Sequence, residues 1–287
     1  MRTIDANGTT IAFEQTGSGV PVILIHGAEA DHSMFDAFGA LLTRHFTVIA
    51  YDQRDSGATR NPAMQYGLGE LADDAAALIE ALGFERAHVF GTSLGGVIAQ
   101  GLAVRHPERV GRLVLSSTFR AGTPPLAINP EVFPKLAALR AGLPGTAAEI
   151  AGYFFPAEYI AAHPEVARIF SGNSRDERQR QRRGAILAQP VDCDLAAIAA
   201  PTLVLAGAED RLIPPAHTLA LAREIANART ATMASVGHVA TLQDPAAVAR
   251  AVLAFLLDES IDESMTTTTM TGGNHERPGG RSRRDLR

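Results

Sequence analysis

The clearest chemical signal lies at residues 91–95, which read Gly-Thr-Ser-Leu-Gly between an apolar run and a helical pattern. A serine on a tight strand-to-helix turn presents its hydroxyl as a nucleophile, and the flanking glycines let neighbouring backbones approach without clashes. The helix beyond the turn offers backbone N–H groups and a positive dipole end to a developing oxyanion. The motif therefore predicts that Ser93 is the nucleophile of an acyl-transfer reaction.

A nucleophilic serine needs a base, and the base needs a carboxylate that orients it. His238 is the predicted base, because it lies in a loop late in the chain, just ahead of the last helical stretch. Asp210 is the predicted acid, since it follows an apolar run at the position where open α/β sheets place their site residues. Glu209, one residue nearer the strand, is the rival acid. The other acid position, after the run that ends at Leu115, holds only hydroxyl side chains.

Two backbone N–H groups are predicted to bind the oxyanion. One belongs to Leu94, directly after the serine, and the other to Ala28, in the loop that follows the apolar run at residues 22–25. Gly27 allows the turn of that loop. The loss of one such donor typically lowers the rate about 100- to 1,000-fold. His26 is expected to bond the loop backbone rather than to act as a second base.

A mostly parallel sheet is needed to bring these residues together. Asn7-Gly8 between two alternating runs predicts a hairpin, because both residues tolerate positive φ. Continuous apolar runs are typical of strands buried on both faces, and they lie at residues 22–25, 46–50, 87–90, 112–115 and 202–205. Helical patterns alternate with these runs, at residues 71–82, 94–106 and 246–257. This alternation predicts a doubly wound α/β fold.

Residues 120–189 break the strand–helix rhythm. Helices are predicted near residues 131–141, 147–155, 159–170 and 174–187, which makes the segment a helical insertion and a candidate lid. Its aromatic side chains, expected mostly to pack the lid onto the core, are Phe133, Tyr153, Phe154, Phe155, Tyr159 and Phe170. Residues 1–119 and 190–258 then form the core. The Gly-, Thr- and Arg-biased tail at residues 259–287 is predicted to be disordered.

Composition argues against several other kinds of chemistry. The net charge of −5 disfavours nucleic acid as a partner. The only cysteine, Cys193, excludes an intrachain disulfide and a cysteine-based zinc cluster, and no P-loop motif surrounds the only lysine, Lys135. The chain has no apolar run long enough to cross a bilayer, and its polar N-terminus lacks a targeting signal. We therefore expect a cytoplasmic protein with neither a membrane nor a nucleic-acid partner.

Together these features resemble the α/β-hydrolase fold family, specifically its esterase, lactonase and carbon–carbon-bond hydrolase branch. The resemblance covers about residues 10–257 and is carried by Ile25-His26-Gly27, Tyr51-Asp52-Gln53-Arg54, Gly91-Thr92-Ser93-Leu94-Gly95-Gly96, His106-Pro107-Glu108-Arg109-Val110, Gly207-Ala208-Glu209-Asp210 and Gly237-His238. It implies the triad Ser93, Asp210 and His238, a lid over the site, and no cofactor or metal. Two positions depart from the family: Asp55 replaces a common glycine, and Phe35 replaces a frequent tryptophan.

The leading interpretation is a serine hydrolase that cleaves a carboxylic ester or lactone of a medium-sized, largely apolar small molecule through an acyl-serine intermediate. One alternative is hydrolysis of a carbon–carbon bond in diketone-type ring-cleavage products, which uses the same triad. Another is a small-molecule receptor with slow turnover. Charged residues give conflicting hints, since Arg120 could pair with a substrate carboxylate while Glu29 would oppose one. The oligomeric state stays open.

Overall fold

One sheet of nine strands organises the computed structural model, which describes residues 1–171, 175–189, 191, 193–257 and 266–268. The strands are β1 (Arg2–Ala6), β2 (Thr9–Gly17), β3 (Val20–Ile25), β4 (Phe46–Tyr51), β5 (Ala87–Thr92), β6 (Val110–Ser116), β7 (Thr202–Gly207), β8 (Ala228–Met233) and β9 (Thr266–Thr268). Their order is β1-β2-β4-β3-β5-β6-β7-β8-β9. From β4 to β8 in this order, each strand is parallel to the next, whereas β1–β2, β2–β4 and β8–β9 are antiparallel pairs. The doubly wound, mostly parallel fold predicted from the sequence is confirmed.

Helices cover both faces of this sheet, because successive strand side chains point to opposite sides. In β3, Ile23 and Ile25 belong to one buried cluster, together with α2 (Leu68–Ala81) and α3 (Leu94–Arg105). Val22 and Leu24 belong to the other cluster, with α1 (Asp36–Leu42) and α11 (Pro245–Leu256). Two shorter helices, α9 (Pro215–Ala220) and α10 (Ala240–Gln243), complete the core. Because β4, β3, β5, β6, β7 and β8 run parallel to one another, their carboxyl ends lie along the same edge of the sheet.

The chain enters the sheet through the predicted hairpin. Asn7 and Gly8 have φ values of 48° and 69°, as a type I′ turn requires, and they connect β1 to β2. Several short elements escaped prediction, β8 and α1 among them. The strand β8 contains the polar residues Arg229, Thr230 and Thr232 and lacks a continuous apolar run, and α1 spans only seven residues.

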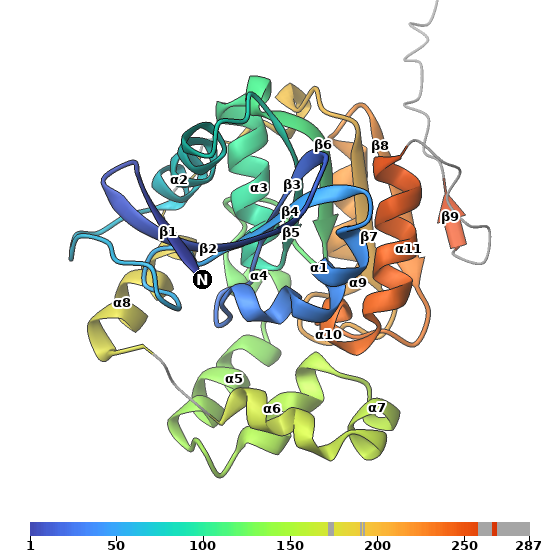
Figure 1. Cartoon of the computed structure of the whole chain (residues 1–287). Helices are drawn as coiled ribbons and strands as arrows, with labels where there is room; N and C mark the ends of the chain where they lie inside the picture. The colour runs from blue at the N-terminus through green and yellow to red at the C-terminus, as the bar shows by residue number, and fades with distance from the viewer. Residues whose placement is uncertain (172–174, 190, 192, 258–265, 269–287) are drawn as a thin grey trace, which may run out of the picture.

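The segment between β6 and β7 is helical, with no strand among its described residues. It contains α4 (Pro125–Ile128), α5 (Val132–Ala141), α6 (Ala147–Phe154), α7 (Ala157–Ala162) and α8 (Glu177–Ala185). Figure 1 shows α5, α6 and α7 grouped at one end of the molecule, apart from the helices that flank the sheet.

One predicted helix is wrong in its extent. The expected helix at residues 159–170 is interrupted, because α7 ends at Ala162 and a 3-10 turn runs from Pro164 to Phe170. Pro164 offers no backbone N–H and disfavours helical geometry at the residue before it, and His163 accordingly has φ −132° and ψ 63°.

The C-terminal tail lies largely outside the described residues, so its predicted disorder stays a prediction. The described part is β9, which pairs with β8. Among the helices of the described ranges, none combines the length and apolar character needed to span a bilayer.

Candidate active site

Ser93 occupies a strained turn between β5 and α3. Its φ of 54° and ψ of −123° lie in a region that L-residues rarely adopt, at a cost of about 1–3 kcal/mol. Hydrogen bonds support this conformation: the Ser93 N–H donates to the Ser116 carbonyl at 3.1 Å, and the Thr118 hydroxyl donates to the Ser93 carbonyl at 2.6 Å. The serine is partly exposed, whereas the residues on both sides of it are buried. The turn thus holds the Ser93 hydroxyl outward from tightly packed backbone.

Two glycines of the motif are required by close backbone contacts. A methyl group on Gly91 would collide with the Gly95 carbonyl oxygen, and one on Gly95 would collide with the Ile25 carbonyl oxygen. The turn therefore packs directly against the end of β3, so both ends of the Gly-x-Ser-x-Gly motif must lack a side chain.

Asp210 and His238 are in direct contact. Oδ2 of Asp210 lies 2.8 Å from Nδ1 of His238, and both residues are buried. The other carboxylate oxygen, Oδ1, accepts the Leu212 and Ile213 N–H groups at 2.9 and 2.8 Å, which fixes the carboxylate in place. Since the carboxylate accepts at Nδ1, the neutral ring carries its hydrogen there and presents Nε2 as an acceptor. Glu209, the rival acid, is exposed.

The three predicted triad residues share one edge of the sheet. Ser93 follows β5, Asp210 follows β7 and His238 follows β8. The strands β5, β6, β7 and β8 are adjacent and parallel, so the three residues lie beyond the same ends of these strands. Among the described residues, Ser93 makes no hydrogen bond to His238. Such bonds are often long in structures without substrate and tighten in the complex.

The helical insertion contacts His238, which the sequence did not reveal. The His238 N–H donates to the Phe154 carbonyl at 2.8 Å, and the two rings meet edge-on with centroids 5.5 Å apart. The Phe154 ring also packs against Phe170 at 4.7 Å. Phe155 is buried and stacks on Tyr159 with ring centroids 5.3 Å apart, a contact within the insertion itself.

The two predicted oxyanion donors flank the serine. Leu94 is the first residue of α3, and the loop at Gly27 passes so close that a methyl group there would lie 3.4 Å from Ser93 Cβ. Neither the Ala28 N–H nor the Leu94 N–H donates a hydrogen bond to any residue that the structure describes. Both N–H groups are therefore unused by the described part of the chain.

His26 is structural, as the sequence suggested. Its Nδ1 lies 2.7 Å from the Gly27 carbonyl, and its Nε2 accepts the Gln53 N–H at 3.2 Å. Burial, together with the charge of Arg183, lowers the pKa of His26 to about 3. The ring is therefore neutral at any ordinary pH.

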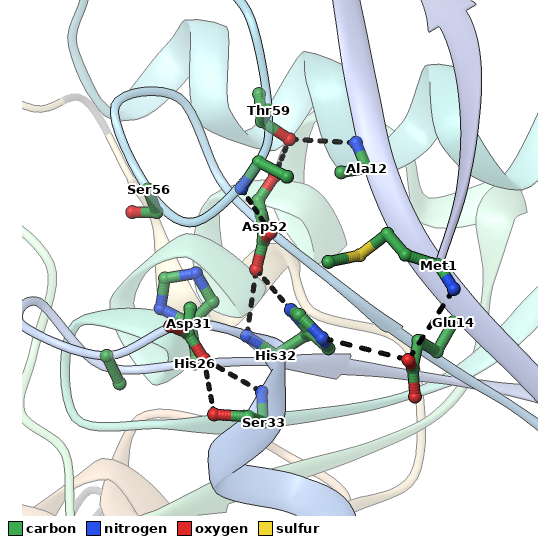
Figure 2. A network of polar contacts seen from close by, with 12 residues as sticks. Met1, Ala12, Glu14, His26, Asp31, His32, Ser33, Asp52, Ser56 and Thr59 are labelled. Carbon is green, nitrogen blue, oxygen red and sulfur yellow. Dashed lines mark hydrogen bonds and ion pairs between the residues drawn. The ribbon is translucent and has the colours of Figure 1, made fainter. Parts of the chain in front are cut away.

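A polar network next to this loop centres on Asp52 (Figure 2). Oδ1 of Asp52 accepts from the His32 backbone N–H at 2.9 Å and lies 2.7 Å from His32 Nδ1, while Oδ2 accepts the Ala58 N–H at 2.8 Å. Asp31, His32 and Asp52 place potential metal-ligand atoms within 4.8 Å of one another. The carboxylates already serve protein donors, since Asp31 Oδ1 accepts both the N–H and the hydroxyl of Ser33. The network thus anchors the end of β4 to the turn after β3.

The contacts of Asp55 explain why an aspartate can stand where the family commonly has glycine. Its φ is 55°, in the region where glycine is usual. Its carboxylate accepts hydrogen bonds from Nε and Nη2 of Arg182, each at 2.7 Å. Burial raises the pKa of this carboxyl, but hydrogen bonds from Arg182 and Tyr66 outweigh that effect and hold it below its ordinary value. The aspartate therefore ties α8 to the loop after β4.

The two charged side chains that could have indicated a substrate charge, Arg120 and Glu29, both have protein partners. Arg120 Nε donates to Glu224 at 3.0 Å, and Glu29 lies 3.6 Å from Arg140 Nε. Neither ion pair therefore indicates whether the substrate carries a charge.

Comparison with known proteins agrees with this geometry. The chain belongs to the alpha/beta hydrolase fold family, whose model matches residues 20–245, and it is a hydrolase. It is 34% identical to a provisionally named carbamate hydrolase, RutD, of Variovorax paradoxus (strain S110), over 76% of this chain and 84% of that protein. It is 30% identical to 2-hydroxymuconate semialdehyde hydrolase of Pseudomonas putida, over 90% and 94%. Among solved structures, the enol-lactonase of Burkholderia xenovorans LB400 has a TM-score of 0.78 at 26% identity, over 89% of this chain and 100% of that chain.

Proposed function

We propose that the protein is a serine hydrolase that cleaves a carboxylic ester or lactone of a medium-sized, largely apolar molecule. The observation that carries this proposal is the 2.8 Å contact between Asp210 and His238 at the sheet edge where Ser93 stands on its strained turn. A nucleophile, a base and an orienting acid are the groups that acyl transfer requires.

In the proposed mechanism, Ser93 Oγ attacks the substrate carbonyl carbon while His238 Nε2 takes the hydroxyl proton. The Ala28 and Leu94 N–H groups stabilise the tetrahedral oxyanion. The intermediate collapses as His238 returns the proton to the leaving oxygen, which leaves an acyl-serine. Water then attacks the acyl carbon while His238 Nε2 takes a proton from it. The bond between Ser93 Oγ and the acyl carbon breaks, His238 returns the proton to Oγ, and the acid product departs. Asp210 keeps the proton on Nδ1 and stabilises the imidazolium.

Support for an ester or lactone comes from the enol-lactonase and from an esterase of Thermogutta terrifontis, which is 27% identical with a TM-score of 0.77. The relative named 2-hydroxymuconate semialdehyde hydrolase favours carbon–carbon bond hydrolysis as the second candidate. The contact between Phe154 and His238 supports a lid role for residues 120–189, because the insertion reaches the proposed base. We further propose a cytoplasmic location, where the buried Cys193 stays reduced.

The test of the nucleophile is Ser93→Ala. Turnover of p-nitrophenyl butyrate should fall on the order of 10⁶-fold, the loss typical of a missing triad serine, with an unchanged melting temperature. A fluorophosphonate should label Ser93 stoichiometrically in the unchanged protein. Labelling of another residue would refute the assignment.

The test of the bond type is a substrate panel. A γ-lactone, a short-chain p-nitrophenyl ester, an aryl carbamate and a 2-hydroxy-6-oxo-dienoate should be compared by kcat/KM. Preference for the ester or lactone supports the first candidate, and preference for the dienoate supports the second. A single burst without turnover on every substrate would favour a receptor.

A further inference from the structure

One arginine of the helical insertion lies against the predicted oxyanion loop. Arg183, in α8, is buried and donates to the Ala28 carbonyl at 3.1 Å and to the Arg54 carbonyl at 2.9 Å. A third hydrogen bond runs to Gln53 Oε1 at 2.9 Å. These three acceptors are neutral. Burial lowers the pKa of Arg183 to about 10, so the guanidinium remains charged near neutral pH.

Gln53 carries the connection on to His26. Its side-chain amide donates to the His26 carbonyl at 2.6 Å, and its backbone N–H donates to the His26 ring. The ring in turn donates to the Gly27 carbonyl at 2.7 Å. As a result, the three consecutive carbonyl groups of residues 26–28 each have a donor, and Arg183 holds the last of them.

Fixed carbonyl groups mean fixed peptide planes. The Ala28 N–H belongs to the peptide whose carbonyl is Gly27, and the Ala28 carbonyl belongs to the next peptide. With both carbonyl groups held, rotation about the two bonds of Ala28 is restricted, so its N–H keeps one direction. Preorganised donors of this kind stabilise a transition state because they need not reorient during the reaction.

We propose that Arg183 is a positioning residue for the oxyanion-binding loop, so that α8 of the insertion completes the catalytic site rather than only covering it. This inference rests on the proposed function. The neighbouring Arg182 holds the same helix through Asp55 instead, and none of its bonds reaches residues 26–28. Arg182 therefore provides a matched control for the anchoring of α8 alone.

The experiment compares Arg183→Met with Arg182→Met, and Arg178→Met, an exposed position on α8, serves as a surface control. Arg183→Met should lower kcat for p-nitrophenyl butyrate about 10- to 100-fold, less than the full loss of an oxyanion donor, with KM within about threefold of wild type. Affinity for a trifluoromethyl ketone, which mimics the tetrahedral oxyanion, should fall by a similar factor. Arg182→Met should lower the melting temperature without this selective loss of kcat. Arg183→Lys should recover part of kcat, since an ammonium can reach only one acceptor at a time.

Several outcomes would overturn the proposal. Equal kcat losses in Arg183→Met and Arg182→Met would make Arg183 a simple anchor, and a rise in KM alone would make it a substrate contact. If Arg183→Met does not fold, Arg183→Lys decides: lowered kcat at unchanged KM supports the proposal, and wild-type kcat refutes it. Fluorophosphonate labelling separates this result from the proposed function. Failure to label Ser93 in the wild type rejects the hydrolase mechanism, whereas normal labelling with unaffected Arg183 variants rejects only this inference.

Discussion

Two buried histidines lie in loops at the same edge of the sheet, His26 after β3 and His238 after β8, and their surroundings differ. Both ring nitrogens of His26 face backbone groups, the Gly27 carbonyl and the Gln53 N–H. His238 faces the Asp210 carboxylate through Nδ1. A carboxylate stabilises an imidazolium, whereas a backbone N–H directed at Nε2 requires that nitrogen to stay unprotonated.

The difference teaches which side of the site suits proton transfer. Protonation of His26 would break its bond from Gln53, and its pKa of about 3 puts that event far below neutral pH. The region around His26 and Asp52 therefore keeps the same hydrogen bonds across the ordinary pH range. The region around Asp210 and His238 has the arrangement that the proposed mechanism needs for a proton carrier.

The largest effect expected from this comparison is that of His238→Gln. Loss of the base should reduce kcat on the order of 10⁶-fold, since a triad histidine and serine act as one unit. The measurement is turnover of p-nitrophenyl butyrate, with circular dichroism as the control for folding. A variant that keeps more than about a hundredth of wild-type activity would move the base elsewhere.

The next effect separates the two candidate acids. Asp210→Asn keeps the shape but leaves the wrong tautomer at His238, so kcat should fall on the order of 10⁴-fold. Glu209→Gln should stay within about tenfold, up to roughly 1.4 kcal/mol, because Glu209 is exposed and Asp210 makes the contact. Steady-state kinetics across pH 6–9 measure both. If Glu209→Gln proves the crippling change, the acid assignment is wrong by one residue.

Much of the sheet and the location of the site were predictable because their signals are local. The apolar runs mark strands buried on both faces, and the ends of two such runs indicated the positions of Ser93 and Asp210, whereas His238 was identified by its loop ahead of the last helical stretch. The break at Pro164 was also visible in the sequence, since proline disfavours helix at the residue before it. It was missed because the apolar spacing continues through it.

The contacts of the insertion with the site were not predictable, because they join segments that lie far apart in the chain. The sequence Glu-Arg-Gln-Arg-Gln-Arg-Arg at residues 177–183 is typical of an exposed helix, yet Arg183 is buried. Its partners include backbone carbonyl groups, and every residue type has one. The same holds for the Phe154 carbonyl that accepts the His238 N–H.

A smaller effect concerns stability at low pH. Since the folded pKa of His26 is about 3 and the ordinary value is 6.5, the unfolded chain binds a proton that the native ring does not bind between those values. His26 therefore contributes stability above pH 6.5 that is lost as the pH falls toward 3, at up to about 1.4 kcal/mol per pH unit. In urea titrations from pH 6.5 to 4.5, the unfolding free energy of His26→Asn should decline less steeply than that of wild type. His45→Asn, at an exposed position, is the control. Parallel curves for His26→Asn and wild type would contradict the neutral state of the ring.

The smallest effect is expected at Arg120, which follows β6, the strand between those that carry Ser93 and Asp210. Its guanidinium donates to Glu224 at 3.0 Å and to the Ala121 carbonyl at 3.1 Å, and the two side chains of the ion pair are 45% and 42% exposed. An exposed pair of this kind contributes less than about 1 kcal/mol, so Arg120→Gln should scarcely change the unfolding free energy. The ratio of kcat/KM for an ester with a carboxylate to that for its neutral analogue should change less than about twofold, a difference of roughly 0.4 kcal/mol. Glu224→Gln is the matched control, because it releases Arg120 from its partner. A tenfold fall of the ratio in Arg120→Gln, with a rise in Glu224→Gln, would instead show that Arg120 recognises a substrate carboxylate and that a third region of this sheet edge takes part in binding.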